Sequence, residues 1–365
     1  MSAVEERKAL VAMSGGVDSS VAVRLLQQQG YVCHGITMRL NDWTDEGCDS
    51  GRTCCAQKDI VAAARAALRL GISHEVLDCR EEFRARVIEP FVRTYEEGGT
   101  PNPCIECNRS LKFETLLHLA LSRGMECLAT GHYARIEYDK ASGLWQLKKA
   151  LDNAKDQSYV LYMLSQSQLE RLRFPLGGLI KTETRAMAES LGLCNARKPD
   201  SQDICFVPDG NYVGFMERYR GRPYPPGDIV DLNGRTLGRH KGAVRYTPGQ
   251  RKGLGLALGE PAYVCGKDMA ANTVSVGPEE ALYSSALTAA AVNWVAGQAP
   301  EGPRPVQAKT HYGAGTAEAV VYPLPDGRFR LEFDRPQRAL TAGQAAVLYD
   351  GELVLGGGTI CEVER

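Results

Sequence analysis

Residues 11–23, VAMSGGVDSSVAV, decide the fold of this chain. They join an apolar run over residues 8–13, typical of a buried strand, to a helical pattern over residues 19–30. Between the two, Gly15 and Gly16 permit a tight turn in which backbone amides approach an anion, and the first helical turn adds a partial positive charge. A strand, a glycine-rich loop and a helix in this order predict a phosphate-binding loop at the end of a parallel strand.

The pattern around this loop predicts three domains. Over residues 1–205, short apolar runs alternate with helical patterns, which predicts an α/β domain with a doubly wound parallel sheet. Residues 206–283 are rich in Gly, Pro and Arg and predict a small central domain. Residues 284–365 alternate short strands with tight turns, which predicts a C-terminal β-barrel.

Within the first domain the same reading assigns individual elements. Strands are expected over residues 31–40 and 73–79, and a further strand that runs into a loop over residues 126–138. Helices are expected over residues 58–72, 81–98 and 110–125.

The composition excludes several classes of protein. No stretch reaches the ~18 consecutive apolar residues of a membrane-spanning helix, and the N-terminus lacks the apolar segment of a signal peptide. We therefore expect a cytoplasmic protein without a membrane partner. The formal net charge of −1 gives no overall attraction to nucleic acid, but residues 217–252 carry nine Lys/Arg against three acidic residues, a basic stripe that is compatible with a phosphate backbone.

The glycine-rich loop has its own chemistry. It lacks the G-x-x-x-x-G-K-[ST] spacing of the loop that handles a γ-phosphate. The hydroxyl groups of Ser14 and Ser19 can donate to phosphate oxygens, and Asp18 is placed to hold Mg²⁺ or to orient the phosphates.

Three cysteines lie in polar, motif-like surroundings. Cys104 and Cys107 belong to TPNPCIECNRSLKF (residues 100–113), and Cys205 belongs to KPDSQDICFV (residues 198–207). Metal, redox and nucleophilic roles are all open to such a set, as is plain packing for the first two. Zinc is disfavoured, because no second C-x-x-C and no histidine at finger spacing accompany them. Cys48, Cys54 and Cys55 have no assigned role, and six cysteines in apolar stretches are expected to pack in the core: Cys33, Cys79, Cys127, Cys194, Cys265 and Cys361.

These motifs together resemble a known family. The loop SGGVDSS is similar to the pyrophosphate loop of the PP-loop ATP pyrophosphatases, which include amidating synthetases and RNA-thiolating enzymes. With ATGHYAR (129–135), KDQSYVLY (155–162), YTPGQRKGLG (246–255) and the three cysteines, the chain resembles the bacterial tRNA-specific 2-thiouridylases. The resemblance spans the whole chain and implies ATP-dependent 2-thiolation of the wobble uridine, position 34, of tRNA, with AMP and pyrophosphate as products.

The chemistry agrees with this resemblance. The C2 carbonyl of uracil is a poor electrophile, and adenylation of O2 converts that oxygen into a good leaving group that a sulfur nucleophile can displace. By the family's pattern, Cys205 would carry a persulfide received from a sulfur donor. Cys107 would be the nucleophile or the resolving thiol that releases the sulfur.

One position departs from the pattern. Many members of the family carry Asp where this chain has Cys104, and there the carboxylate is thought to act in acid–base chemistry beside the target base. Cys104, Cys107 and Cys205 could instead hold three irons of a [4Fe–4S] cluster, leaving the fourth iron open to hydrosulfide. Both routes, cluster and persulfide relay, stay open at this point.

The resemblance also implies the ligand contacts. ATP would meet residues of the pyrophosphate loop and of two further strand ends: Ala12, Met13, Ser14, Gly15, Gly16, Val17, Asp18, Ser19, Met38 and Gly131. The target base would meet Asn102, Pro103, Cys104 and His132 after leaving the anticodon stack. Other tRNA contacts would come from Lys155, Asp156, Gln157, His311, Tyr312 and Gln344.

The implied partners are ATP, Mg²⁺, tRNA and a sulfur donor such as a cysteine desulfurase or a relay protein, and we expect a monomer. Two other functions remain as alternatives. One is a PP-loop thiolase that acts on another tRNA position or on a cytidine. The other is a catalytically silent RNA-binding protein.

Overall fold

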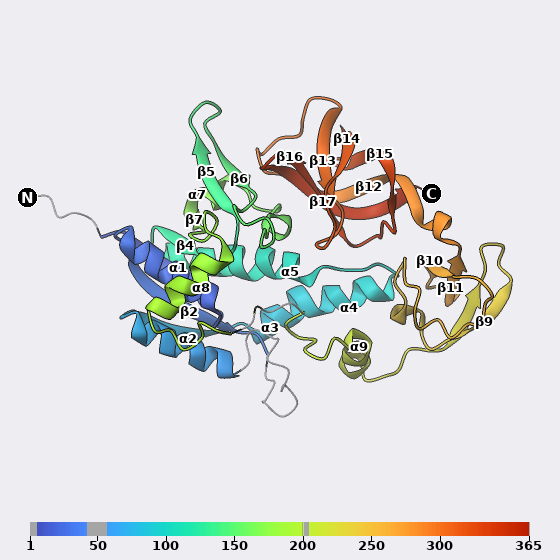
Figure 1. The fold of residues 1–365 in the computed structure, drawn as a ribbon, viewed down its shortest axis with the longest axis horizontal. Coiled ribbons are helices and arrows are strands. Elements are labelled where there is room, and N and C mark those ends of the chain that lie inside the picture. The colour runs from blue at the N-terminus through green and yellow to red at the C-terminus, as the bar shows by residue number, and fades with distance from the viewer. Residues whose placement is uncertain (1–5, 42–56, 199, 201–203, 365) are drawn as a thin grey trace, which may run out of the picture.

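The computed structural model describes residues 6–41, 57–198, 200 and 204–364. Cys48, Cys54 and Cys55 lie outside these described residues. Figure 1 shows the N-terminal domain on one side, the central domain on the other, and the C-terminal barrel above the helices that connect them.

The N-terminal domain is built on a five-stranded sheet in the order β3-β2-β1-β4-β7. Every neighbouring pair is parallel, so the prediction of a doubly wound parallel sheet is confirmed. The strands are β1 (Lys8–Ala12), β2 (Val32–Arg39), β3 (Ser73–Asp78), β4 (Cys127–Ala129) and β7 (Leu172–Arg173).

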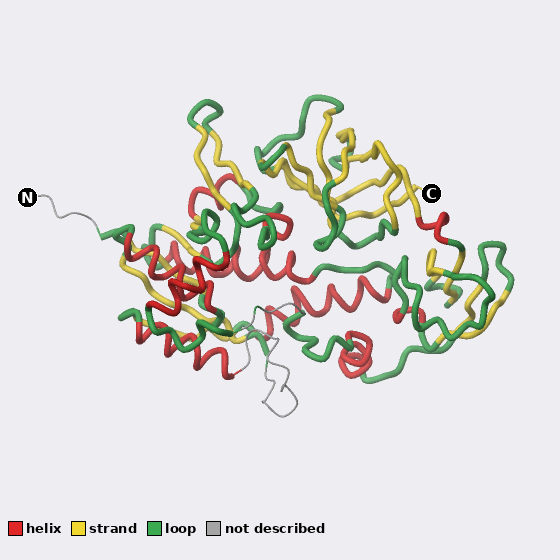
Figure 2. Tube along the Cα trace, in the orientation of Figure 1, coloured by secondary structure: helices red, strands yellow, loops and turns green. Residues whose placement is uncertain are grey.

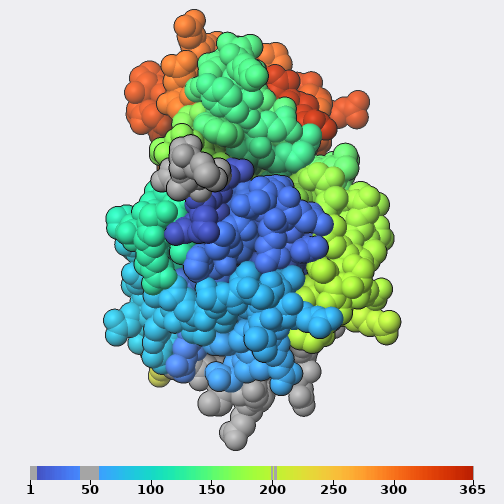
Figure 3. Space-filling model, turned by 90° about the vertical axis from the view of Figure 1, so that its left-hand side faces the viewer, coloured from blue at the N-terminus to red at the C-terminus, as the bar shows by residue number. Residues whose placement is uncertain are grey.

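Side chains of β1 alternate between two hydrophobic cores. Ala9 and Val11 pack with the layer formed by α1 (Val17–Gln28), α2 (Gln57–Arg69) and α8 (Lys181–Ser190). Leu10 packs on the other side. Because successive strand residues point to opposite faces, one apolar run supplies both cores. Figure 3 shows this end of the molecule, with the segment that contains α8 beside the blue N-terminal elements.

The second layer is a pair of long helices that lie side by side through the middle of the molecule (Figure 1). The first consists of α3 (Arg80–Phe83), a π-helical segment (Arg84–Ile88) and α4 (Glu89–Glu96). The second consists of α5 (Pro103–Glu106), a π-helical segment (Cys107–Leu116) and α6 (Leu117–Ser122).

The second helix begins earlier than the sequence pattern predicts. We expected it from residue 110, but it starts at Pro103, so that Cys104 and Cys107 lie on its first turns. Proline is tolerated at the first helical position because its missing N–H would be unsatisfied there anyway. Asn102 caps this end, accepting a hydrogen bond from the Cys104 N–H at 3.2 Å.

The connection between the two long helices contacts the barrel. The Thr100 N–H donates to the Ala342 carbonyl at 2.8 Å, and Gln344 Nε2 donates to the Thr100 carbonyl at 2.8 Å. The barrel thus directly supports the loop that leads into the Cys104 helix.

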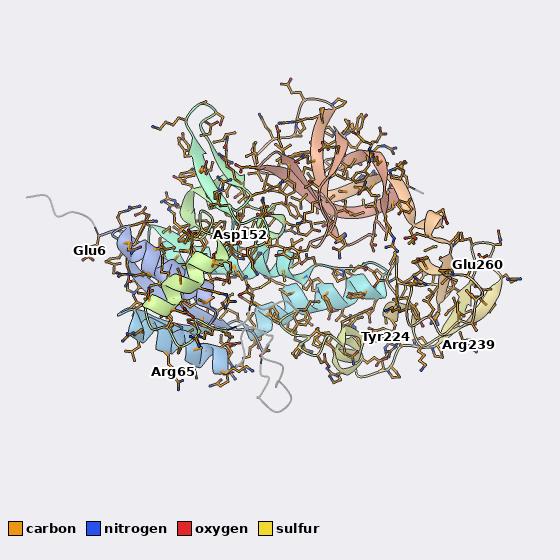
Figure 4. All side chains as sticks on the ribbon, viewed as in Figure 1. Glu6, Arg65, Asp152, Tyr224, Arg239 and Glu260 are labelled. Carbon is orange, nitrogen blue, oxygen red and sulfur yellow. The ribbon has the colours of Figure 1, made fainter. Side chains whose placement is uncertain are left out.

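The central domain has a four-stranded sheet in the order β10-β11-β8-β9, an α-helix, α9 (Tyr212–Arg220), and short 3₁₀ turns at Ala243–Arg245 and Glu279–Leu282. The strands are β8 (Gly227–Val230), β9 (Thr236–His240), β10 (Tyr263–Asp268) and β11 (Thr273–Gly277). Figure 4 labels Tyr224 beside α9, and Arg239 and Glu260 at the far edge of this domain.

The C-terminal domain is a closed six-stranded barrel, as predicted. Its strands pair in the order β12-β15-β14-β13-β16-β17, and β12 pairs with β17 to close it. They are β12 (Tyr283–Trp294), β13 (Arg304–Lys309), β14 (Ala317–Pro323), β15 (Phe329–Arg338), β16 (Ala345–Asp350) and β17 (Leu353–Glu364). Figure 2 shows the contrast between this strand-rich domain and the helical middle.

A hairpin links the first and last domains. β5 (Arg135–Asp139) and β6 (Leu144–Lys148) pair with each other, and Lys148 pairs with Leu353 of β17. The sequence pattern predicted one strand running into a loop here. In the structure β4 ends at Ala129, and the chain leaves the parallel sheet before the hairpin begins.

Among the described residues, no helix combines the length and the apolar character that crossing a membrane would need.

Candidate functional site

The candidate site lies at the carboxyl ends of β1 and β4. These strands are neighbours, and the chain order reverses at this point of the sheet, which is where doubly wound sheets bind ligands. The loops that follow them touch. A Cβ built on Gly131, after β4, would lie 2.7 Å from the Ser19 backbone nitrogen and 2.8 Å from the Asp18 carbonyl carbon. Only glycine allows this approach.

The loop after β1 presents the start of α1 to the site. Gly15 has φ +73°, and a Cβ there would lie 2.3 Å from the Asp59 carbonyl oxygen, so this position also requires glycine. Ser19 Oγ accepts the Ser14 N–H at 3.3 Å and donates to the Gly16 carbonyl at 3.2 Å. Within the described residues, no side chain caps α1 at Gly16. The first amides of α1 are therefore suited to a phosphate ligand.

A single cavity of about 570 Å³ joins this loop to the cysteines. Its volume is in the range of sites that take a nucleotide-sized ligand. Most of the predicted site residues line it: Ala12, Met13, Ser14, Gly16, Val17, Asp18, Ser19, Met38, Pro103, Cys104, Cys107, Gly131, His132, Lys155, Gln157, Cys205 and Tyr312.

Five predicted site residues do not line this cavity in the described part of the chain: Gly15, Asn102, Asp156, His311 and Gln344. Most of them support its walls. Asp156, for example, accepts the Ala150 N–H at 3.0 Å and the Ser158 hydroxyl at 2.7 Å. Asn102 caps the Cys104 helix, and Gln344 holds the loop before it.

The three cysteines reach the cavity from two segments. Cys104 is exposed and Cys107 is buried, both on the first turns of the second long helix. Cys205 is partly buried and belongs to the segment that leads into the central domain. In the described residues, no three Cys, His, Asp or Glu side chains form a group that could hold a metal ion.

A buried cation faces the phosphate loop. Lys181, the first residue of α8, has a side chain only 9% exposed, and its Nζ donates to both Asp18 carboxylate oxygens at 2.7 and 2.8 Å. The Tyr133 hydroxyl also donates to Asp18, at 3.1 Å. The Lys181 backbone N–H donates to Asp152 at 3.0 Å, and Figure 4 labels this aspartate. The PP-loop acid is thus held by a lysine that the sequence reading missed.

Asp200 is a second acid that the sequence reading missed. Its carboxylate pairs with Lys181 at 2.7 Å, Lys155 at 2.8 Å and Arg185 at 3.2 Å. Burial alone would raise the pKa of Asp200, but the hydrogen bonds from Lys155 and Lys181 outweigh it and lower that pKa. The hydrogen bond to Asp200 raises the pKa of Lys155. The one available signal was Asp200's place inside the quoted motif of Cys205.

His132 lines the cavity as a neutral ring. Its Nδ1 is hydrogen-bonded to the Thr130 hydroxyl at 2.7 Å, and its ring contacts those of Phe113 and Phe174 at centroid distances of 5.7 Å. Burial, with a smaller effect of Lys112, lowers its pKa well below the ordinary value. His132 therefore provides hydrogen bonding and shape rather than positive charge.

The barrel contributes an aromatic side chain to the cavity. Tyr312 is 48% exposed and its ring meets that of buried Tyr159 at a centroid distance of 6.0 Å. Lys309 Nζ lies 5.5 Å from the Tyr312 ring centroid. Such an aromatic ring, held from one side and open to solvent, suits stacking on a base.

Some arginines of the basic stripe, residues 217–252, form ion pairs within the protein. Arg220 bonds to Glu89 and Glu96 of α4 at distances down to 2.9 and 2.8 Å, and Arg245 bonds to Glu217 at 2.7 Å. Arg220 thus docks the central domain on α4, and Arg245 pairs within the central domain. The stripe therefore offers less charge to a ligand than its sequence implies.

Comparisons with known proteins match the whole chain. Family models match residues 7–209 (tRNA methyl transferase HUP domain), 214–278 (tRNA methyl transferase PRC-barrel domain) and 284–360 (aminomethyltransferase β-barrel domain). A protein of Acetivibrio thermocellus is 47% identical over 98% of this chain and 100% of its own length. Others, from Heliobacterium modesticaldum and Magnetococcus marinus, are 49% and 48% identical over 96% and 98% of this chain, and 91% and 99% of their own lengths. All three are named tRNA-specific 2-thiouridylase MnmA.

Proposed function

The chain belongs to the tRNA-specific 2-thiouridylase family and is a tRNA sulfurtransferase, and on this premise we propose that it thiolates C2 of the wobble uridine, position 34, at the expense of ATP. The observation that carries this proposal is the shared cavity. One space is lined both by the phosphate loop and by Cys104, Cys107 and Cys205. An enzyme that only adenylates needs no thiols beside its nucleotide.

The first step is adenylation of the base. The uracil O2 attacks the α-phosphorus of ATP, the bond to the β-phosphate breaks, and pyrophosphate leaves. The amides at the start of α1 and the buried Lys181 ammonium are placed to hold the phosphates. Mg²⁺, when bound, would neutralise phosphate charge, and Asp18, which lines the cavity at the start of α1, is a carboxylate that would hold it.

The second step replaces oxygen by sulfur. The terminal sulfur of a Cys205 persulfide attacks C2, and AMP leaves with the former O2. Cys107 then attacks the Cys205 sulfur, which releases the thiolated base and leaves a Cys107–Cys205 disulfide for an external thiol to reduce. Both residues line the cavity from separate segments, as this exchange requires.

A [4Fe–4S] cluster is the competing sulfur carrier. Its three cysteines line one cavity, but in the described arrangement they do not form a ligand group. The steps above are therefore derived from the thiols alone. Cys104 stands where the resemblance implies a carboxylate in many members of the family, so this chain would place a third thiol beside the target base.

The base must leave the anticodon stack to reach this cavity. We propose that Tyr312 of the barrel and Gln157 meet the displaced nucleotide, because both line the cavity. Lys155 lies at the same wall and supplies charge to the RNA backbone. The protein is proposed to act as a cytoplasmic monomer that receives its sulfur from a cysteine desulfurase or a relay protein.

The experiment is a reconstituted reaction. Purified protein is incubated with Mg·ATP, a persulfide donor and an unmodified tRNA transcript, and the nucleosides are analysed by mass spectrometry. We expect 2-thiouridine from the wild-type transcript and none when position 34 is cytidine. A thionucleoside at another position would favour the alternative thiolase, and an unchanged transcript would contradict the proposal.

The sulfur carrier is tested separately by anaerobic purification. The cluster would be established if the wild type contains stoichiometric iron and sulfide and if Cys104→Ser loses both the iron and the activity. A colourless, iron-free protein that is active with a persulfide donor, and that retains activity in Cys104→Ser, would establish the relay. Cys107→Ser and Cys205→Ser should be inactive in either case.

A further inference from the structure

Three cations of the site share the carboxylate of Asp200. Lys155 comes from the loop after β6, whereas Lys181 and Arg185 lie four residues apart on the same face of α8. Their distances to Asp200 are 2.8, 2.7 and 3.2 Å. Its side chain is only 23% exposed, so these contacts are screened less than those of a surface pair.

These contacts form a continuous chain of charge. Asp18 in the phosphate loop bonds to Lys181, Lys181 bonds to Asp200, and Asp200 bonds to Lys155. One end of this chain lies in the nucleotide site and the other in the segment proposed to contact RNA. Asp200 is the link between the two ends.

Three like charges in so small a volume repel one another unless an acid lies between them. Lysine side chains are long and lose considerable freedom when fixed, so each needs a partner to stay in one place. Lys181 has a second acid, Asp18, to hold it. In the part of the chain that the structure describes, Asp200 is the acid within hydrogen-bonding distance of Lys155 and Arg185.

We propose that Asp200 is a positioning residue that fixes Lys181 for the ATP phosphates and Lys155 for the RNA backbone. This inference rests on the proposed function, because it takes the two lysines as contacts of ATP and tRNA. Asp200 also lines the cavity, but the role proposed for it is exerted through the two cations and not by contact with either ligand. The lowered pKa of Asp200, set by hydrogen bonds that outweigh its burial, keeps the carboxylate charged for this role at neutral pH.

The test measures binding rather than turnover. Dissociation constants are determined for an unmodified tRNA transcript and, separately, for α,β-methylene-ATP with Mg²⁺, in wild type and in Asp200→Asn. We expect roughly tenfold weaker binding of each ligand in Asp200→Asn, since coupling free energies between sites typically correspond to about 5- to 150-fold in affinity. Asp200→Glu, which keeps the charge but shifts it, should recover part of both affinities, and it remains informative if Asp200→Asn does not fold.

A double-mutant cycle separates positioning from general damage. In a Lys155→Met background, Asp200→Asn should not weaken tRNA binding further, and in a Lys181→Met background it should not weaken nucleotide binding further. Glu189→Gln is the matched control, because Glu189 also lies on α8 but pairs with an exposed arginine, Arg197, at 3.3 Å. That variant should bind both ligands as wild type does.

The outcomes that overturn the inference are clear. If Asp200→Asn binds both anionic ligands as tightly as wild type or more tightly, Asp200 only offsets charge. If its effects add fully to those of Lys155→Met and Lys181→Met, it does not act through these lysines. If the wild type formed no 2-thiouridine, the proposed function would be contradicted. The double-mutant cycle would still measure the coupling of Asp200 to the two lysines.

Discussion

Replacing Gly131 by alanine tests the contact between the two loops that form the site. The new Cβ would lie 2.7 Å from the Ser19 nitrogen, 2.8 Å from the Asp18 carbonyl carbon and 3.0 Å from the Asp18 Cβ. To restore an ordinary contact of 3.4 Å, one loop must retreat by about 0.7 Å. Two of the three atoms are backbone, so the strain cannot be relieved by turning a side chain.

The expected cost follows from this overlap. Overpacking of a well-packed region costs about 1–3 kcal/mol, which corresponds to roughly 5- to 150-fold in a binding constant. Part of this free energy should appear as weaker binding of α,β-methylene-ATP, measured by calorimetry, because the phosphate loop is displaced. The rest should appear as a lower free energy of unfolding, measured in urea. Gly178→Ala is the matched control, because a Cβ there meets no atom within 4 Å.

We expect Gly131→Ala to lose nucleotide affinity, with or without stability, and Gly178→Ala to lose neither. If Gly131→Ala bound nucleotide like the wild type at unchanged stability, the loops would not be in the contact described here. The nucleotide would then not lie between the loops that follow β1 and β4.

Three further predictions concern other parts of the molecule. Burial lowers the pKa of Lys267 from 10.5 to about 8, and its Nζ has no hydrogen-bond partner in the described part of the chain. Lys267→Met should therefore raise the free energy of unfolding at pH 7 by about 2–3 kcal/mol. The unfolded chain binds more protons between pH 8 and 10.5, so this gain should fade as the pH rises through that interval, and an unchanged difference across it would refute the assignment. Arg220→Ala should lower the free energy of unfolding in urea by about 1.5–3 kcal/mol, because the bonds to Glu89 and Glu96 are lost. The side chain of Arg239 is 70% exposed and lies 3.8 Å from Asp228, so Arg239→Ala should change the free energy of unfolding by less than about 1 kcal/mol. Equal effects of the two substitutions would contradict the docking role of Arg220. Tyr312→Ala should weaken tRNA binding by about 1–3 kcal/mol and Tyr312→Phe should not, and the loss should vanish with a transcript that lacks the base at position 34 if Tyr312 stacks on that base.

Local sequence patterns were sufficient for the parts of the fold that depend on local physics. The strand, glycine loop and helix around Gly15 follow from periodicity and backbone freedom, and the barrel follows from alternation and turns. The predicted start of the Cys104 helix was wrong, because Pro101 and Pro103 indicate the end of a helix unless Asn102 is known to cap a new one. The β5–β6 hairpin was missed although its pairing is local, because residues 126–138 were assigned to one strand running into a loop, whereas β4 ends at Ala129 and β5 begins at Arg135.

The site shows the same division. The loop residues and the three cysteines could be named from motifs, and the structure brings most of them to one cavity. Lys181 and Asp200 could not, since a lysine at a helix start and an aspartate in a loop are ordinary in sequence. Their importance arises from pairs that span many residues, such as Asp18 with Lys181. The basic stripe was overestimated for the same reason, because the acids that neutralise Arg220 lie on α4.

The central claim is that the oxygen displaced from the uracil leaves on AMP. It can be tested with a tRNA whose target uridine carries ¹⁸O at O2, incubated with the protein, Mg·ATP and a persulfide donor. We expect one AMP for each 2-thiouridine formed, with the ¹⁸O label in the phosphate of that AMP. Thiolated RNA accompanied by unlabelled AMP, or by ADP, would contradict it.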